Sequence, residues 1–153
     1  MAVLNWSECD LKHATSTDGA PTGEWDELPT PKEDSTQLTT TAGTEKTATE
    51  EGGALVDYLP GKNTYQLEWD EFVKKGEDPS FEDNDGVITG EHAFRVEAQD
   101  KDCPAIQIDR AVLRVEDSYT TADGQLRHYV ARALKPKTGK TIKSYVPSEQ
   151  SGG

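Results

Sequence analysis

A strict alternation of apolar and polar residues constrains the fold of this chain more than any other feature. In the segment 65–69, tyrosine, leucine and tryptophan are separated by polar residues, and the same period of two recurs over 94–98 and 113–116. Successive side chains of a β-strand point to opposite faces of a sheet, so this spacing predicts strands with one buried face. Evidence for helices is thin by comparison. We therefore expect a mainly β fold.

Turn sequences between the apolar runs indicate antiparallel connections. Pro60-Gly61-Lys62-Asn63 and Asp123-Gly124 are both typical of tight turns. The predicted strands cover residues 54–59, 64–71, 91–98, 106–117 and 125–134, with a short terminal strand near 141–146. The residues expected in the core are Tyr65, Leu67, Val96, Leu113, Val115 and Val130, and Trp69 shares the apolar face of its strand.

The length of 153 residues suits a single domain. We expect an antiparallel β-sandwich or barrel of about six to eight strands, with one short flanking helix and a long polar arm. The helix is placed either at the end of the run 69–76 or in the acidic stretch after Pro79. The expected organisation is a loop-rich segment and arm over 1–51, a β core over 52–146 and a flexible tail over 147–153.

The arm is expected over residues 33–51, where threonine, glutamate and serine dominate. Leu38 is the one large apolar residue of this segment. Such a composition cannot bury enough apolar surface to fold alone, although threonine also favours strands. We interpret the segment as a long polar hairpin or arm that is mobile in the free subunit and ordered against a neighbouring chain. A flexible linker between two domains is disfavoured, because too few residues precede it.

The formal net charge of −13 argues against ordinary binding to nucleic acid, which needs a basic surface to displace phosphate counterions. The charge is also uneven. Residues 124–153 hold six bases and one acid, about +5, whereas the rest of the chain carries about −18. One interpretation is a solvated acidic surface with a basic last strand. The other is a subunit with complementary ends, suited to head-to-tail contact between copies.

The sequence carries no equipped active site. The acidic stretch 82–86 resembles a calcium loop, but with Gly86 at the sixth position Phe81 and His92 occupy the ends of the cage, where oxygen ligands are required. Residues 139–141 contain a Gly-Lys-Thr triplet without the first glycine of a phosphate loop. No cluster of histidine and cysteine has the spacing of metal ligands. We therefore expect no enzymatic activity, no catalytic residue, no cofactor and no metal.

Two further features concern the compartment. Cys9 and Cys103 are far apart, and we expect idle thiols, with a disulfide as the alternative. No stretch approaches the apolar length of a membrane span, and the start has neither a basic leader nor an apolar signal run. We expect a product of the cytoplasm that does not contact a membrane.

Several stretches resemble tail-tube proteins of phages and prophages of gut Bacteroidetes. They are EGGALVD at 51–57, PGKNTYQLE at 60–68, VEDSYTTADG at 115–124 and ALKPKTGK at 133–140. The resemblance implies a β-sandwich or barrel flanked by a helix, with six subunits closing a ring by joining their inner sheets. Rings stack through extended loops and termini into a hollow tube, which holds DNA and the tape-measure protein without sequence-specific binding. The chain would then be made in the host cytoplasm and end in the virion tail.

The resemblance, taken with the strand pattern, assigns candidate functional residues. The expected lumen-facing acids, which point away from the apolar strand faces and would repel phosphates, are Glu68, Asp70 and Glu116. The expected contacts between stacked rings are Lys135, Lys137, Lys140, Lys143 and Leu38.

Other functions stay open at this point. A tail terminator or a tube subunit of a contractile injection system shares the fold class. A monomeric β-sandwich that binds carbohydrate or acts as an adhesin would explain the acidity, but it leaves the arm without a purpose. No small-molecule substrate is expected for an assembling subunit.

Overall fold

The structure is a computed structural model that describes residues 8–150. This part of the chain is mainly β, as predicted. Its elements are β1 (Cys9–Thr17), β2 (Ala20–Pro21), β3 (Asp26–Glu27), β4 (Gln37–Thr41), β5 (Lys46–Thr49), β6 (Leu55–Leu59), β7 (Thr64–Phe72), β8 (Glu91–Ala98), β9 (Ala105–Thr120), β10 (Gly124–Ala133), β11 (Ile142–Tyr145) and the helix α1 (Pro147–Gln150). The strands predicted from the alternating runs are confirmed, with small differences at their ends. The additional strands are the long β1, the short β2 and β3 that pair with it, and β4 and β5.

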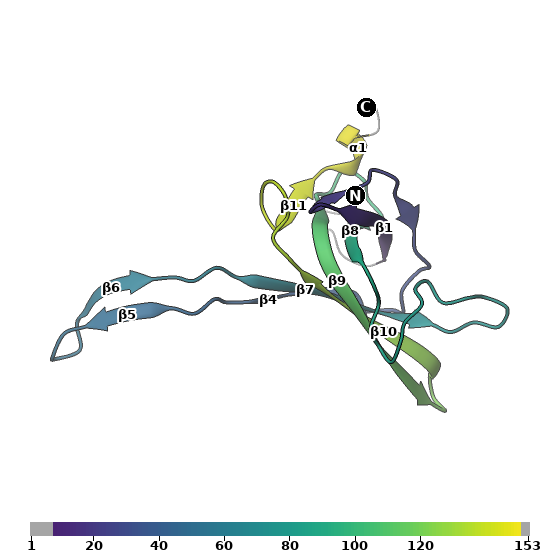
Figure 1. Cartoon of the computed structure of the whole chain (residues 1–153), viewed down its shortest axis with the longest axis horizontal. Helices are drawn as coiled ribbons and strands as arrows, with labels where there is room; N and C mark the ends of the chain where they lie inside the picture. Colours follow the sequence, from purple (N-terminus) through teal and green to yellow (C-terminus); the bar gives the residue numbers. More distant parts are fainter. Residues whose placement is uncertain (1–7, 151–153) are drawn as a thin grey trace.

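Nine of these strands form one antiparallel sheet that curls into a half-barrel (Figure 1). Its order is β2-β1-β8-β9-β10-β7-β4, while β3 pairs with β1 and β11 pairs with β9. The long strand β9 changes partner at Ala111, because residues before it pair with β8 and residues after it pair with β10. The register between β8 and β9 is irregular at this point, because the step from His92 to Phe94 on β8 corresponds to the longer step from Ala111 to Ile108 on β9. Irregularities of this kind bend a strand, which fits the curl of the sheet.

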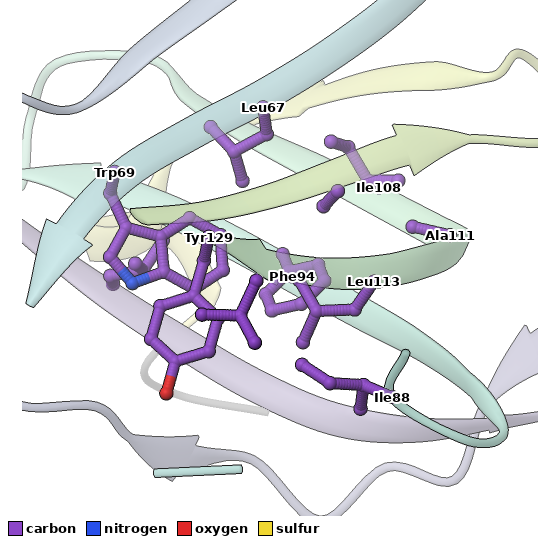
Figure 2. Close-up of a cluster of buried hydrophobic side chains, with 11 residues drawn as sticks. Leu67, Trp69, Ile88, Phe94, Ile108, Ala111, Leu113 and Tyr129 are labelled. Atoms are coloured by element: carbon purple, nitrogen blue, oxygen red, sulfur yellow. The ribbon is translucent and has the colours of Figure 1, made fainter. Parts of the chain in front are cut away.

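The hydrophobic core lies inside the curl (Figure 2). Trp69 is central to it, because its ring lies 5.2 Å from the ring of Tyr129 and 5.3 Å from that of Phe94. The predicted core residues Leu67, Leu113, Val115 and Val130 are buried, whereas Tyr65 and Val96 are half-buried. The cluster consists of Leu11, Leu67, Trp69, Ile88, Phe94, Ile108, Ala111, Leu113, Val115, Tyr129 and Ala131.

Strands β5 and β6 form a separate two-stranded ribbon that projects from the half-barrel (Figure 1). We call residues 42–63 the ribbon. At its base two glycines are required, because a Cβ atom on Gly43 would lie 2.2 Å from the carbonyl oxygen of Lys62, and one on Gly61 would lie 2.4 Å from that of Thr44. The backbones of the two limbs therefore touch at this point.

The ribbon differs from the polar arm expected over 33–51, which is not confirmed in that form. The first part of that segment, β4, pairs with β7 in the main sheet. The strand predicted at 54–59 is the second limb of the ribbon and pairs with β5, although it was expected in the β core. The ribbon thus combines a polar limb with an apolar one.

The expected flanking helix is also not confirmed. Residues 69–72 continue β7, because Trp69 to Phe72 stay paired with β10. After Pro79 the structure has a loop held by the Arg127 guanidinium, which donates to the backbone oxygen of Phe81 and to Asp83. The one helix in residues 8–150 is α1, a single turn in the segment expected as a flexible tail. Residues 151–153 of that tail, and residues 1–7 of the N-terminal segment, lie outside the described part.

Candidate functional site

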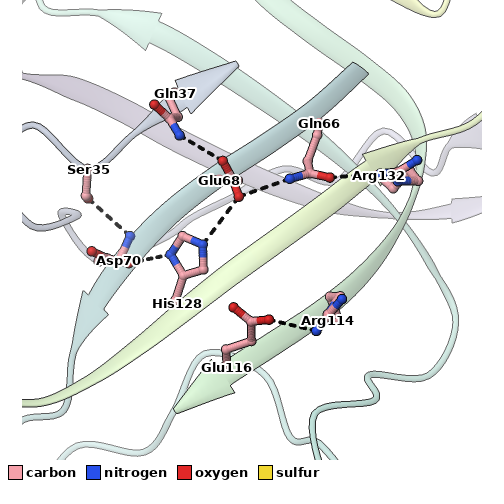
Figure 3. A network of polar contacts seen from close by, with 9 residues as sticks. All are labelled: Ser35, Gln37, Gln66, Glu68, Asp70, Arg114, Glu116, His128 and Arg132. Atoms are coloured by element: carbon pink, nitrogen blue, oxygen red, sulfur yellow. Dashed lines mark hydrogen bonds and ion pairs between the residues drawn. The ribbon is translucent and has the colours of Figure 1, made fainter. Parts of the chain in front are cut away.

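The predicted lumen acids lie on what we call the outer face, the surface of β4, β7, β10 and β9 that is opposite the core cluster. Glu68 and Asp70 alternate along β7 with Leu67 and Trp69, which are buried in the core. The period of two along the strand therefore places both carboxylates on the outer face, as predicted. Figure 3 shows them side by side with residues from the neighbouring strands.

His128 of β10 lies between these two carboxylates. Its Nδ1 atom is 2.6 Å from Asp70 Oδ1, and its Nε2 atom is 3.4 Å from Glu68 Oε1 (Figure 3). The contact follows from the sheet register, which places His128 directly opposite Asp70. Partial burial alone would lower the pKa of His128, but the hydrogen bonds and charges of Asp70 and Glu68 outweigh it and raise the pKa.

Neutral amides complete the surroundings of Glu68. The Gln37 side chain of β4 donates to Glu68 over 2.8 Å, and the Gln66 side chain donates over 3.0 Å. The hydrogen bond from Gln37 contributes most to lowering the pKa of this carboxyl. Gln66 in turn accepts from Arg132 of β10 over 3.1 Å. Glu68 is therefore held ionised in one orientation.

The third predicted acid, Glu116, is also paired. It accepts a hydrogen bond of 2.7 Å from Arg114, its neighbour on the same face of β9. Both side chains are more than half exposed, so this pair contributes little to stability. Glu116 thus pairs with a cation, and Glu68 and Asp70 share the imidazole of His128, so the outer face is a polar network rather than a bare acidic surface.

The structure places the candidate ring contacts in different environments. Lys135, Lys137 and Lys140 are exposed on the loop between β10 and β11. Lys143 of β11 instead forms an ion pair with Asp109, a carboxylate that is almost fully buried. Lys143 is therefore engaged within the subunit.

Leu38 is half-buried as well. It pairs with Leu67 in the β4–β7 register and packs against the core cluster. Its side chain is directed into the subunit, which leaves its proposed role between rings a prediction without structural support.

The apolar surface of the ribbon was missed by the sequence reasoning. Leu55 and Val56 are each 60% exposed, Tyr58 is 46% exposed and Leu59 is 61% exposed. The available signal was the short apolar run between Gly53 and Pro60, which was interpreted as a strand of the β core. Directly paired residues share a face of a ribbon. Tyr58 and Leu59 are consecutive on β6 and so point to opposite faces, where they lie opposite Thr47 and Lys46. Apolar side chains therefore occupy both faces of the ribbon.

Within residues 8–150, no group of three or more histidine, cysteine, aspartate or glutamate residues has an arrangement that could hold a metal ion. No helix in this part is long and apolar enough to cross a membrane. Cys9 and Cys103 are both free thiols, and burial raises the pKa of Cys9.

Comparisons with known proteins do not assign the chain. No protein-family model matches it, and a search of curated proteins finds no significant match.

Proposed function

We propose that this chain is a structural subunit that assembles with copies of itself into stacked, tail-tube-like rings. The observation that carries the proposal is the ribbon, which exposes four large apolar side chains. An isolated two-stranded hairpin is at best marginally stable in water, and contiguous exposed apolar surface is typical of protein interaction sites. A second copy of the chain would cover this surface.

Charge supports a second copy as the partner. Residues 45–62 of the ribbon carry four acids and two lysines, and two of the acids, Glu50 and Glu51, lie at its end. The loop between β10 and β11 exposes Lys135, Lys137 and Lys140. Opposite charges on different parts of one subunit favour a heterologous contact, which generates rings or filaments.

The open sheet supports ring formation. Among the described strands, β4 ends the order of the curled sheet, so its outer edge has no partner strand. The three threonines at the end of β4 are exposed. An open edge is a ready template for pairing with another chain. We propose that neighbouring subunits continue the sheet across this edge, so that their outer faces together line the lumen.

The outer face suits a conduit for DNA and a tape-measure protein. Glu68, Asp70 and Glu116 contact His128 and Arg114, and the remaining cation, Arg132, is bonded to the neutral Gln66. Such a face offers few free cations to phosphates, so DNA would slide without sticking. A conduit of this kind needs neither a cofactor nor a small-molecule substrate.

The test is electron microscopy and analytical ultracentrifugation of the purified chain. We expect rings or tubes from the native chain. The double substitution Leu55→Asp and Leu59→Asp should leave folded monomers, because it places charges on the apolar ribbon. The matched control is Val87→Asp, which changes an apolar residue that is 64% exposed on the body of the subunit and should still assemble.

A featureless monomer from the native chain at high protein concentration would overturn the proposal. It would favour the monomeric binding module instead. A single ring that does not stack would favour a terminator over a tube subunit.

A further inference from the structure

The most specific arrangement on the outer face is the position of His128 between two carboxylates. Each of its two ring nitrogens faces a carboxylate oxygen, at 2.6 Å on the Asp70 side and at 3.4 Å on the Glu68 side. Neutral imidazole has one N–H donor, so its other nitrogen would direct a lone pair at an anion. The doubly protonated ring donates to both carboxylates. The geometry therefore selects the charged form of the side chain.

The wider surroundings agree with that assignment. On β9, Glu116 lies opposite His128 in the register and is bonded to Arg114, while on β10 Arg132 is bonded to Gln66 of β7. Gln37 of β4 is neutral. With a proton on His128, three cations balance the three carboxylates of the network. Without that proton, the network carries one uncompensated negative charge.

Partial burial strengthens the effect of this charge balance. The exposed fractions are 33% for the side chain of His128, 25% for Asp70 and 17% for Glu68. Charges at such sites interact more strongly than they do in open solvent. Loss of the proton would leave the two carboxylates of β7 facing a neutral ring.

We propose that Glu68, His128 and Asp70 form a proton-binding triad that couples the charge of the outer face, and the pairing of β7 with β10, to pH. His128 keeps its second proton to a higher pH than free imidazole. When it loses the proton, the Glu68 contact weakens and the face becomes more negative. The effect on the subunit is independent of assembly. Its consequence for a lumen, a more strongly anionic lining at alkaline pH, rests on the proposed function.

The other two histidines provide an internal reference. His13 and His92 contact each other and lie against Phe81 and Phe94, so they occupy an apolar environment. Burial lowers the pKa of both. The three histidines of the chain should therefore titrate in two separate groups, with His128 on the alkaline side of free imidazole and the buried pair on the acid side.

The experiment is a pH titration of the ¹⁵N ring signals of all three histidines in the full chain, in solution for a monomer or in the solid state for an assembly. His128→Gln assigns the signal by removing it. We expect the His128 midpoint to lie above that of free histidine, and Asp70→Asn to shift it to lower pH by more than Glu68→Gln does. Glu116→Gln, whose carboxylate is bonded to Arg114, is the matched control and should shift it least.

Two results would overturn the proposal. One is a His128 midpoint at or below that of free histidine. The other is a midpoint that Asp70→Asn leaves unchanged in a variant whose backbone spectrum shows a native fold. Both readings are made on the subunit itself, so failure of the triad is distinguishable from failure to form rings.

Discussion

The Nε2 atom of His13 lies 2.9 Å from the Nδ1 atom of His92, in a hydrogen bond that links β1 to β8. The Nε2 atom of His92 lies 3.0 Å from the backbone oxygen of Thr89, to which it donates. The Nδ1 atom of His92 must then accept, so His13 donates from Nε2. His92 is therefore neutral in this arrangement. Protonation of His92 at Nδ1 would place its N–H donor opposite the Nε2–H donor of His13.

This pair predicts a loss of stability in acid. Burial, reinforced by the neighbouring His92, lowers the pKa of His13 from its ordinary value of 6.5 to about 4. The unfolded chain therefore binds a proton at a pH where the folded chain resists it, and stability falls as the pH drops from about 6.5 towards 4. Urea denaturation at a series of pH values between 7 and 4 measures the effect.

The variant His13→Phe separates this contribution from that of the carboxylates. It keeps a ring against Phe81 and Phe94 but removes one titrating group, so the slope of stability against pH should become shallower between pH 6.5 and 4. A slope equal to that of the native chain would show that the histidine pair does not cause the acid sensitivity.

A second prediction concerns the core. Leu113→Ala should lower the free energy of unfolding by about 2–5 kcal/mol, because Leu113 is 1% exposed and its removal leaves a cavity. Val112→Ala, one position earlier on β9 and 44% exposed, should change it by about 0.5 kcal/mol or less. Chemical denaturation of both variants tests the division of β9 into a core face and an outer face. Similar losses for the two would contradict it.

A third prediction concerns the base of the ribbon. Gly43→Ala places a methyl group within 2.2 Å of the Lys62 carbonyl oxygen, which cannot move without shifting the second limb. We expect faster hydrogen exchange of the ribbon amides and loss of assembly, with a small change in the unfolding of the main sheet. Thr44→Ala, which removes atoms at the neighbouring position, is the control. Native-like exchange in Gly43→Ala would show that the limbs do not approach so closely.

Much of the main sheet was predictable because its strands carry the buried face in their own sequence. The segment 91–98 alternates clearly and is a strand with the predicted bounds. Strand β1 was missed, since its buried positions include the small residues Ala14 and Ser16 and its ring against the core is His13. These side chains give no apolar period of two. Their burial follows from pairing with β8, which is distant in sequence.

The candidate site likewise combines features that one strand specifies by itself with features that depend on the pairing of distant strands. The direction of Glu68 and Asp70 follows from alternation within β7 and was predicted. Their contact with His128 depends on the register between β7 and β10, strands separated by more than fifty residues, and no local pattern specifies it. The exposure of Leu55 and Leu59 was likewise not predictable, because the sequence of an apolar run does not show whether its own chain or another chain covers it.

The last prediction tests the basic end of the chain, where the structure separates two kinds of lysine. Lys137 and Lys140 are exposed, so reversing both to glutamate should leave folding nearly unchanged, because exposed charges contribute little to stability. If these lysines meet the acidic end of the ribbon in the next copy, the double reversal should impair stacking.

Stacking of the native chain should also weaken as salt rises, since screening limits exposed charges to about 8 Å at physiological ionic strength. Sedimentation over a salt series measures both effects. Lys143→Met is the contrasting variant. It leaves the buried carboxylate of Asp109 without its cation, and breaking a buried pair in this way costs about 3–5 kcal/mol of folding stability. The loss of folding stability in Lys143→Met should lie at or below the lower end of this range, because Lys143 is itself only half-buried. Stacking that is insensitive both to salt and to the reversal of Lys137 and Lys140 would show that the basic loop is a solvated surface, even in a chain that forms tubes.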